Sequence, residues 1–265
     1  MNSRSICLLK SMIDPNLPIL LCHVLKKPRS FLLTYPDYQP SDQEQAEFNA
    51  LKVRYEQGEP VAYLIGKKGF WNHYFKVTPD VLIPRPETEL LLELALHKVP
   101  RSAQVIELGT GSGCLAISFA LERPDCQVMA VDLSENALAI AKENAVQLKT
   151  GAIVFIQSNW FDALPPQKVE AILSNPPYIE KQDSHLKDLR FEPELALVSG
   201  ESGLEAIELI IKQARFFLKP GGFLALEHGY NQKEAVQALF QEYQYYDIET
   251  RLDLQAHPRV TWGHV

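Results

Sequence analysis

Strand-like and helix-like segments alternate along the chain from Glu87 onward. Because strands joined by helical crossovers pair in parallel, this alternation predicts a doubly wound α/β domain with a mainly parallel sheet. Two further apolar runs, 246–251 and 259–262, are expected to form a hairpin at one edge of that sheet. The expected parallel strands are 104–108, 127–131, 153–157, 169–174 and 223–227, and the expected helices are 87–98, 114–123, 134–148 and 204–218.

The first part of the chain has a helical pattern instead. Ser41 followed by Glu44 predicts a helix start in which each side chain hydrogen-bonds the other residue's backbone, and Gly58 is expected to end that helix. Residues between these helices and the alternating region are aromatic and β-branched, with turn signals among them. We therefore expect three regions: a helical bundle over 1–65, a β-hairpin linker over 66–86 and the doubly wound domain over 87–265.

Charge and hydropathy narrow the range of partners. The chain has 26 basic and 33 acidic side chains, and its formal net charge of −7 argues against a broad contact surface for double-stranded nucleic acid. No apolar stretch approaches the ~20 residues that span a bilayer, and residues 1–14 lack the continuous apolar core of a signal peptide. The sequence predicts a cytoplasmic monomer that binds neither membranes nor nucleic acid directly.

The cysteines are scattered through apolar stretches without the paired spacing of zinc sites. This distribution is typical of buried free thiols in a reducing compartment, so we expect neither disulfides nor a metal site. The four residues are Cys7, Cys22, Cys114 and Cys126.

The tetrapeptide Asn175-Pro176-Pro177-Tyr178 directly follows an expected strand. A planar amino nitrogen is a weak nucleophile because its lone pair is delocalised, and it attacks a methyl sulfonium well only when acceptors hold both N–H bonds. The side-chain oxygen of Asn175 and the carbonyl oxygen of Pro176 can be those acceptors, since two prolines fix the backbone between them. Tyr178 would pack its ring on the planar group. Taken alone, the motif could equally be a turn that ends a strand.

A glycine-rich turn, Glu107-Leu108-Gly109-Thr110-Gly111-Ser112-Gly113, joins an expected strand to an expected helix. Such glycines let the backbone approach a nucleotide ligand at the carboxyl ends of the strands. A dinucleotide site needs a third small residue where Cys114 stands. The pattern instead favours S-adenosylmethionine, whose ribose and methionine parts lie against backbone and whose sulfonium tolerates a nearby acid such as Glu107.

Two later strand ends carry residues suited to the same ligand. Asp132 follows the glycine turn by roughly 20 residues, where a carboxylate can accept hydrogen bonds from both ribose hydroxyls. Asp132 could instead cap a helix, although Ser134 is the better cap. After the third strand, Asn159 could read the adenine edge and Trp160 could cover the ring, or Trp160 could belong to the core.

Five segments together resemble the HemK-type (PrmC) release factor glutamine methyltransferases. The resemblance implies a Rossmann-like, class I S-adenosylmethionine-dependent methyltransferase domain preceded by a small helical domain. Enzymes of this family methylate the side-chain amide nitrogen, N5, of the glutamine in the Gly-Gly-Gln loop of peptide-chain release factors, which supports translation termination. The five segments are 58–64, 82–89, the glycine turn, 175–178 and 190–193.

The resemblance also implies a role for each motif. The helical domain would help to grip the release factor, and Asn175 would touch both cofactor and substrate. The glutamine amide would be bound by Asn175, Pro176, Pro177 and Tyr178, of which Asn175, Pro176 and Tyr178 would be catalytic. S-adenosylmethionine would be bound by Glu107, Gly109, Thr110, Gly111, Ser112, Gly113, Asp132, Trp160 and Asn175.

Two other functions remain open at the level of sequence. An adenine-N6 methyltransferase acting on DNA or RNA would use the same tetrapeptide chemistry, but it would normally need a base-flipping pocket and a basic surface. A ribosome-associated or RNA-binding module could keep the fold without turnover. The acidic balance argues against the first, and the presence of both motifs argues against the second.

Overall fold

The computed structural model describes residues 14–265 and divides the chain into two compact units, with the boundary in the sequence between Lys67 and Lys68. Residues 1–13, which include Cys7 and the first part of the expected helical bundle, lie outside the described residues. Each unit packs its own apolar core.

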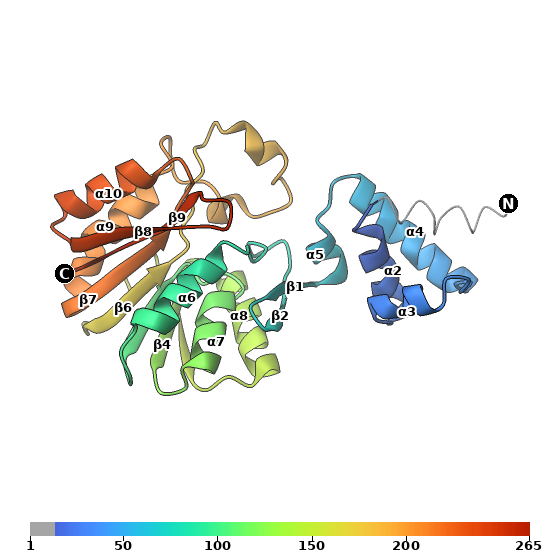
Figure 1. Cartoon of the computed structure of the whole chain (residues 1–265), viewed down its shortest axis with the longest axis horizontal. Coiled ribbons are helices and arrows are strands. Elements are labelled where there is room, and N and C mark those ends of the chain that lie inside the picture. Colours follow the sequence, from blue (N-terminus) through green and yellow to red (C-terminus); the bar gives the residue numbers. More distant parts are fainter. Residues whose placement is uncertain (1–13) are drawn as a thin grey trace. The chain divides into compact units, whose positions relative to one another are not determined.

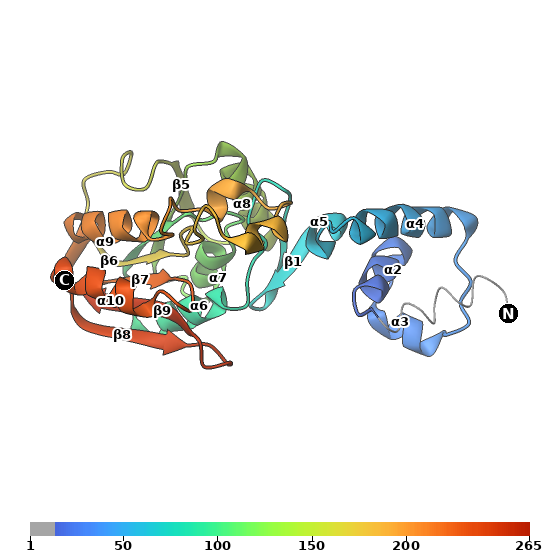
Figure 2. The ribbon, with the colours of Figure 1, turned by 90° about the horizontal axis from the view of Figure 1, so that it is seen from above.

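The first unit is built from short helices, of which α2 lies alongside α4 (Figure 2). Its core is formed mainly by one face of α2, together with Phe48 and Leu64. The expected capping box is confirmed: the Ser41 hydroxyl accepts from the Glu44 N–H at 3.3 Å, and the Glu44 carboxylate accepts from the Ser41 N–H at 2.7 Å. The helices are α2 (Leu17–Leu25), α3 (Arg29–Thr34), α4 (Asp42–Glu56) and α5 (Val61–Ile65).

A short hairpin, β1 (Lys67–Phe70) and β2 (His73–Lys76), precedes the large domain. The side chain of Asn144 ties it to the glycine turn. The Asn144 side-chain oxygen accepts from the Lys76 N–H at 2.7 Å, and its amide nitrogen donates to the Ser112 carbonyl at 2.8 Å. Since this asparagine is fully buried, the hairpin and the turn share one polar anchor within the core.

Within the described residues, seven strands form the main sheet in the order β5-β4-β3-β6-β7-β9-β8 (Figure 1). The first five pair in parallel and the last two are antiparallel, which confirms the doubly wound α/β fold and the terminal hairpin. The strands are β3 (Gln104–Leu108), β4 (Gln127–Asp132), β5 (Ile153–Gln157), β6 (Val169–Ser174), β7 (Leu218–Glu227), β8 (Tyr246–Leu252) and β9 (Pro258–His264).

Helices cover both faces of the sheet because its strands are apolar on both sides. In β3, Val105 packs into the cluster that holds α6 and α7, whereas Ile106 packs into the opposite cluster with α9 and α10. The buried positions of α9 recur at one and four residues, as expected for a helix with a single core-facing stripe. The helices are α6 (Thr88–Lys98), α7 (Cys114–Glu122), α8 (Glu135–Leu148), α9 (Glu205–Phe217) and α10 (Lys233–Glu242).

Two elements differ from the sequence pattern. Helix α10 was not expected; it buries Val236 and Phe240 and packs Leu239 partly against the core. Strand β7 begins at Leu218, five residues before the expected start, although Pro220, Gly221 and Gly222 resemble a turn. A register shift between β6 and β7 accommodates this segment.

No helix within residues 14–265 is both long and apolar enough to cross a membrane.

Gly113 supplies a test of how tightly the glycine turn packs. Its φ is +79°, and a Cβ there would lie 2.8 Å from the Ile117 side chain and 3.1 Å from the Ala141 Cβ. Gly111 also has a positive φ of +54°, but a Cβ there would meet open space. We expect Gly113→Ala to lower the free energy of unfolding by about 1–3 kcal/mol more than Gly111→Ala.

Urea denaturation followed by tryptophan fluorescence measures this difference, since Trp71, Trp160 and Trp262 all lie in the unit that contains the turn. Equal destabilisation by the two substitutions would show that the positive φ alone, and not the packing against α7 and α8, requires glycine at 113.

Candidate active site

The strand order brings the two sequence motifs to one edge of the sheet. β3 and β6 are neighbours although β4 and β5 lie between them in sequence, and Leu108 pairs with Ser174. The Ser174 hydroxyl also donates to the Leu108 carbonyl at 2.8 Å. The glycine turn and the tetrapeptide therefore leave adjacent strand ends, at the point where the strand order reverses. Ligands of open α/β sheets bind at such points.

One cavity, which we call the glycine-turn cavity, has a volume of about 390 Å³. It brings together predicted site residues from the ends of β3, β4, β5 and β6. The remaining walls come from the segments around residues 80–82 and 193–209. The predicted site residues in its lining are Gly109, Gly111, Asp132, Trp160, Asn175 and Pro177.

The carboxylate of Asp132 stands in this cavity with one backbone donor on each oxygen. Gly111 N–H donates to Oδ2 at 2.8 Å, and Ser134 N–H donates to Oδ1 at 2.9 Å. A carboxylate has about four lone-pair sites, so both oxygens can accept further hydrogen bonds. Burial raises the pKa of Asp132 above its usual value, while these backbone donors lower it. Ser134 itself caps α8, as predicted, by accepting from the Ala137 N–H.

Other predicted cofactor residues are buried in the turn itself. The Thr110 hydroxyl donates to the Glu107 carboxyl at 2.5 Å, and the Ala116 N–H donates to the same oxygen at 3.1 Å. Burial raises the pKa of Glu107 to about 8. The geometry thus gives Glu107 and Thr110 a role in shaping the turn and the start of α7. Ser112 and Gly113 pack against α8.

Trp160 has an unusual backbone conformation, with a φ of +50°. A bulky residue in the left-handed region costs free energy, and such strain gathers at ligand sites. Its ring reaches the glycine turn, because a Cβ on Gly109 would lie 3.8 Å from it. The indole also packs partly against the sheet core, so both readings of this tryptophan fit its position.

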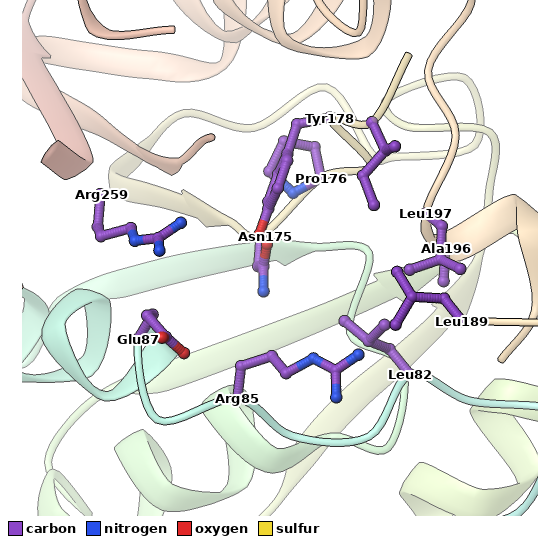
Figure 3. Close-up of a pocket in the computed structure, with 11 residues that line it drawn as sticks. Leu82, Arg85, Glu87, Asn175, Pro176, Tyr178, Leu189, Ala196, Leu197 and Arg259 are labelled. Carbon is purple, nitrogen blue, oxygen red and sulfur yellow. The ribbon is translucent and has the colours of Figure 1, made fainter. Parts of the chain in front are cut away.

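A second cavity, which we call the tetrapeptide cavity, has a volume of about 320 Å³ (Figure 3). Pro176 and Tyr178 line it, and Asn175, Leu82 and Ala196 line both cavities. Figure 3 shows Arg259 on one side of Asn175 and an apolar group on the other. That apolar group is Leu82, Leu189, Ala196 and Leu197. Asn175 therefore stands at the junction of the two cavities.

The Asn175 side chain is held by Thr88, which lies in the 82–89 segment, and through it by Glu227, which the sequence pattern did not single out. Its amide nitrogen donates to the Thr88 hydroxyl at 3.0 Å, and that hydroxyl donates to the Glu227 carboxylate at 2.7 Å. The Tyr178 hydroxyl donates to the other Glu227 oxygen at 3.3 Å. Burial raises the pKa of Glu227 to about 7 and that of Tyr178 above its usual range. In the sequence, the one feature that could have pointed to Glu227 was its position at the carboxyl end of an expected strand.

The backbone of Tyr178 is fixed by two further residues. The Gln232 side chain donates to the Tyr178 carbonyl at 3.0 Å. Gly203, with a φ of +74°, packs so closely that a Cβ would lie 2.5 Å from the same carbonyl oxygen. The end of the tetrapeptide is therefore held by backbone contacts rather than by its own proline rings alone.

Glu192 joins two segments that the resemblance had singled out separately. Its buried carboxylate forms an ion pair with Arg85 and accepts from the Ile83 N–H at 3.0 Å. Both the 82–89 segment and the 189–197 segment line the tetrapeptide cavity. Glu192 thus fastens two of the segments that line this cavity to each other.

Substitution of Glu192 tests this link. We expect Glu192→Gln to cost about 1–3 kcal/mol, because it leaves the Arg85 guanidinium without a charged partner. Hydrogen exchange should quicken at the Ile83 and Leu197 amides, which lie on the two linked segments. Glu194→Gln is the matched control, since Glu194 is exposed and lies two residues away. If hydrogen exchange at both amides were unchanged in Glu192→Gln, Glu192 would not link the two segments.

Solved structures with similar folds define the class of protein. A methyltransferase from Pyrococcus furiosus matches with a TM-score of 0.57, 15% identity and coverage of 82% of this chain and 98% of that chain. The Thermus thermophilus 16S rRNA N2 G1207 methyltransferase in complex with AdoMet and guanosine matches with a TM-score of 0.55, 17% identity and coverage of 75% and 49%. The second unit thus has the Rossmann-like methyltransferase fold.

Sequence relatives then identify the family. A family model described as the PrmC N-terminal domain matches residues 16–66, and one described as the methyltransferase small domain matches residues 86–190. The release factor glutamine methyltransferase of Salmonella typhimurium is 46% identical over 248 residues, covering 92% of this chain and 90% of that protein. The Escherichia coli protein of the same name is 45% identical with the same coverage. The chain belongs to the release factor glutamine methyltransferase family.

Proposed function

We propose that this protein transfers a methyl group from S-adenosylmethionine to the side-chain amide nitrogen of the glutamine in the Gly-Gly-Gln loop of a peptide-chain release factor. The observation that carries the proposal is the junction at Asn175, where a cavity suited to a nucleoside meets a second cavity lined by the rest of the tetrapeptide. Family membership supports the same acceptor.

The glycine-turn cavity fits the methyl donor in size and chemistry. Asp132 has free acceptor sites for the two ribose hydroxyls, and Trp160 offers an aromatic wall for the adenine. Gly109 and Gly111 present bare backbone, which leaves room for the methionine part. When bound, S-adenosylmethionine supplies an electrophilic methyl carbon on a sulfonium, which leaves as a neutral thioether.

The tetrapeptide would hold the acceptor amide. The Asn175 side-chain oxygen and the Pro176 carbonyl oxygen would accept its two N–H bonds, while Tyr178 packs against its plane and Pro177 bounds the neighbouring cavity. Because both N–H bonds point at acceptors, the nitrogen lone pair is turned away from them and toward the methyl carbon. The amide proton leaves after the new N–C bond forms, when the nitrogen is far more acidic. Positioning of this kind can supply ~7–11 kcal/mol of the barrier.

Alanine substitutions separate the two roles. We expect Asn175→Ala to lower kcat by about 10²–10³-fold with a small change in donor affinity, since a transition-state acceptor is lost. Asp132→Ala should raise the dissociation constant for S-adenosylmethionine by about 10- to 100-fold and alter kcat less. Calorimetry and single-turnover methylation measure these effects. Glu135→Ala is the control, because Glu135 is an exposed carboxylate three positions beyond Asp132.

The nature of the acceptor is tested with labelled S-adenosylmethionine. Purified release factor should take up one methyl group per molecule, and a release factor whose loop glutamine is replaced by glutamate should take up none. DNA and RNA serve as competing acceptors in the same assay. Label in nucleic acid and not in release factor would support the adenine methyltransferase instead, and label in neither would support a module without turnover.

We propose further that the helical domain, residues 1–65, contributes to docking of the release factor. Within the described part of that domain, Leu33, Tyr35 and Val53 are exposed apolar side chains, with exposed fractions of 79%, 57% and 53%. Leu33 lies in α3 and Tyr35 directly follows it, so two of these side chains are neighbours on an element that buries none of its residues, whereas Val53 lies in α4. Neighbouring exposed apolar residues are typical of contact surfaces.

Docking predicts a difference between large and small acceptors. We expect Leu33→Ala with Tyr35→Ala to raise KM for a whole release factor by about five- to thirtyfold, because two lost contacts of ~0.5–1 kcal/mol each sum to ~1–2 kcal/mol. KM for a short Gly-Gly-Gln peptide should not change. Val146→Ala, which truncates an apolar side chain of 79% exposure in α8, is the control. An equal rise in KM for the peptide would contradict a docking role.

Two further proposals concern the location of the enzyme in the cell and its oligomeric state. Release factors act where proteins are made, so we propose that the enzyme works in the cytoplasm. We also propose that it acts as a monomer, since residues of a single chain line both cavities. Sedimentation of the purified protein checks the second point.

A further inference from the structure

We propose that Glu227 is a positioning residue that sets the orientation of the Asn175 amide through the hydroxyl of Thr88. This inference rests on the proposed methyl transfer at Asn175 and adds two residues to it. Neither Glu227 nor Thr88 lines either cavity, so both would act through Asn175 rather than on a ligand.

The three side chains come from separate elements and meet in the core. Thr88 is the first residue of α6, Glu227 is the last residue of β7, and Asn175 follows β6. Thr88 and Glu227 are only 4% and 1% exposed. Two hydrogen bonds of 3.0 and 2.7 Å connect Asn175 to Thr88 and Thr88 to Glu227. Such a buried chain is kept only when each donor faces an acceptor.

The direction of these hydrogen bonds is fixed from the carboxylate end. An ionised carboxylate only accepts, so the Thr88 hydroxyl must donate to Glu227. That hydroxyl then has only lone pairs left, and it can face only the NH₂ end of the Asn175 amide. The two ends of an asparagine amide have nearly the same shape, so the hydrogen-bond partners decide between them. The Asn175 oxygen is thereby turned away from Thr88 and left for the acceptor amide.

Protonation of Glu227 removes this constraint. A neutral carboxyl can donate to Thr88, whose hydroxyl can then donate to the Asn175 oxygen. The asparagine would present its NH₂ end to the acceptor amide, and that end cannot accept an N–H bond. Tyr178 donates to the other oxygen of this carboxyl, which still accepts when Glu227 is protonated, so the Tyr178 hydrogen bond does not depend on this charge.

The charged and titratable groups around Glu227 determine when this happens. The Glu87 carboxylate raises the pKa of Glu227, whereas Arg259, Thr88 and Tyr178 lower it, and burial dominates with a result of about 7. Burial is the main cause that raises the pKa of the Cys114 thiol, the Glu107 and Glu227 carboxyls add to it, and the thiol stays neutral. Because the folded-state pKa is raised, the carboxylate form prevails above pH 7 and is lost as the pH falls. The orientation should therefore be lost on the acid side.

Three variants test the proposal in the full-length protein. Thr88→Val removes the hydroxyl at nearly constant volume, Thr88→Ser keeps it, and Glu227→Gln keeps the shape but can donate. We expect kcat to fall at least about tenfold in Thr88→Val and Glu227→Gln, with Thr88→Ser within about threefold of the wild type. Calorimetry should show unchanged affinity for S-adenosylmethionine in all three. A residue that only fills the core would instead give Thr88→Ser, with its lost methyl, the larger defect.

The pH dependence of kcat distinguishes a positioning role from a purely structural one, because a residue that only fills the core would not change it. Wild-type kcat should fall with decreasing pH through about 7, and this acid limb should be absent in Thr88→Val and Glu227→Gln. If Glu227→Gln does not fold, the Thr88→Val and Thr88→Ser pair decides the matter alone. An acid limb that persists in Thr88→Val, or a fully active Thr88→Val enzyme, would overturn the proposal.

A measurement without turnover separates this proposal from the proposed function. The side-chain NH₂ signals of ¹⁵N-labelled Asn175, assigned by their loss in Asn175→Ala, should shift between pH 6 and 8 in the wild type, a window about one unit either side of the Glu227 pKa. They should not shift in Glu227→Gln or Thr88→Val. If the wild type methylates no release factor but shows this shift, the proposed function is wrong and the positioning of Asn175 by Glu227 is still supported. If the Asn175 NH₂ signals of the wild type did not respond to pH, the positioning role of Glu227 would be wrong.

Discussion

The pairing of β3 with β6 is the constraint on which the site depends. These strands are neighbours in the sheet, and Leu108 and Ser174 are paired at their carboxyl ends. The turn that follows one strand and the tetrapeptide that follows the other are consequently within reach of the same small ligand. If β3 and β6 were not neighbours, the two motifs would lie too far apart to contact the same ligand.

A layer of buried polar contacts then holds each motif in place. Asn144 anchors the glycine turn, Gln232 anchors the Tyr178 backbone, and Glu192 joins two of the segments that line the tetrapeptide cavity. Each of these residues is buried and hydrogen-bonded, so an error in position would leave an unsatisfied polar group, which costs ~1–3 kcal/mol. The site is therefore positioned by contacts that tolerate little displacement, as catalysis by orientation requires.

The carboxylates of the large domain have contrasting surroundings. Asp132 retains free acceptor sites toward a cavity, whereas Glu107 and Glu227 are enclosed and bond only to neighbouring protein groups in the residues that the structure describes. Their raised pKa values have the same main cause, which is burial. Their roles differ because one shapes the glycine turn and the other faces the asparagine at the junction of the two cavities.

Local patterns in the sequence were enough to determine most of the elements, the capping box at Ser41 and the family resemblance carried by the motifs. The expected bounds of β3, β5 and β6 agree with the structure because apolar β-branched runs between turn residues depend on near neighbours only. Helix α10 was missed although Val236, Leu239 and Phe240 recur at helical spacing in its sequence.

Tertiary structure alone decided how the motifs are supported. Thr88 and Glu227 are 139 positions apart, and Ile83 and Glu192 are 109 apart, so no local pattern links them. The insertion of β9 between β7 and β8 likewise depends on which strand edges remain free once the parallel strands have paired. The sequence specified which chemical groups the site contains, and long-range packing specified the partners that orient them, because hydrogen bonds between distant segments form only once the sheet has set their spacing.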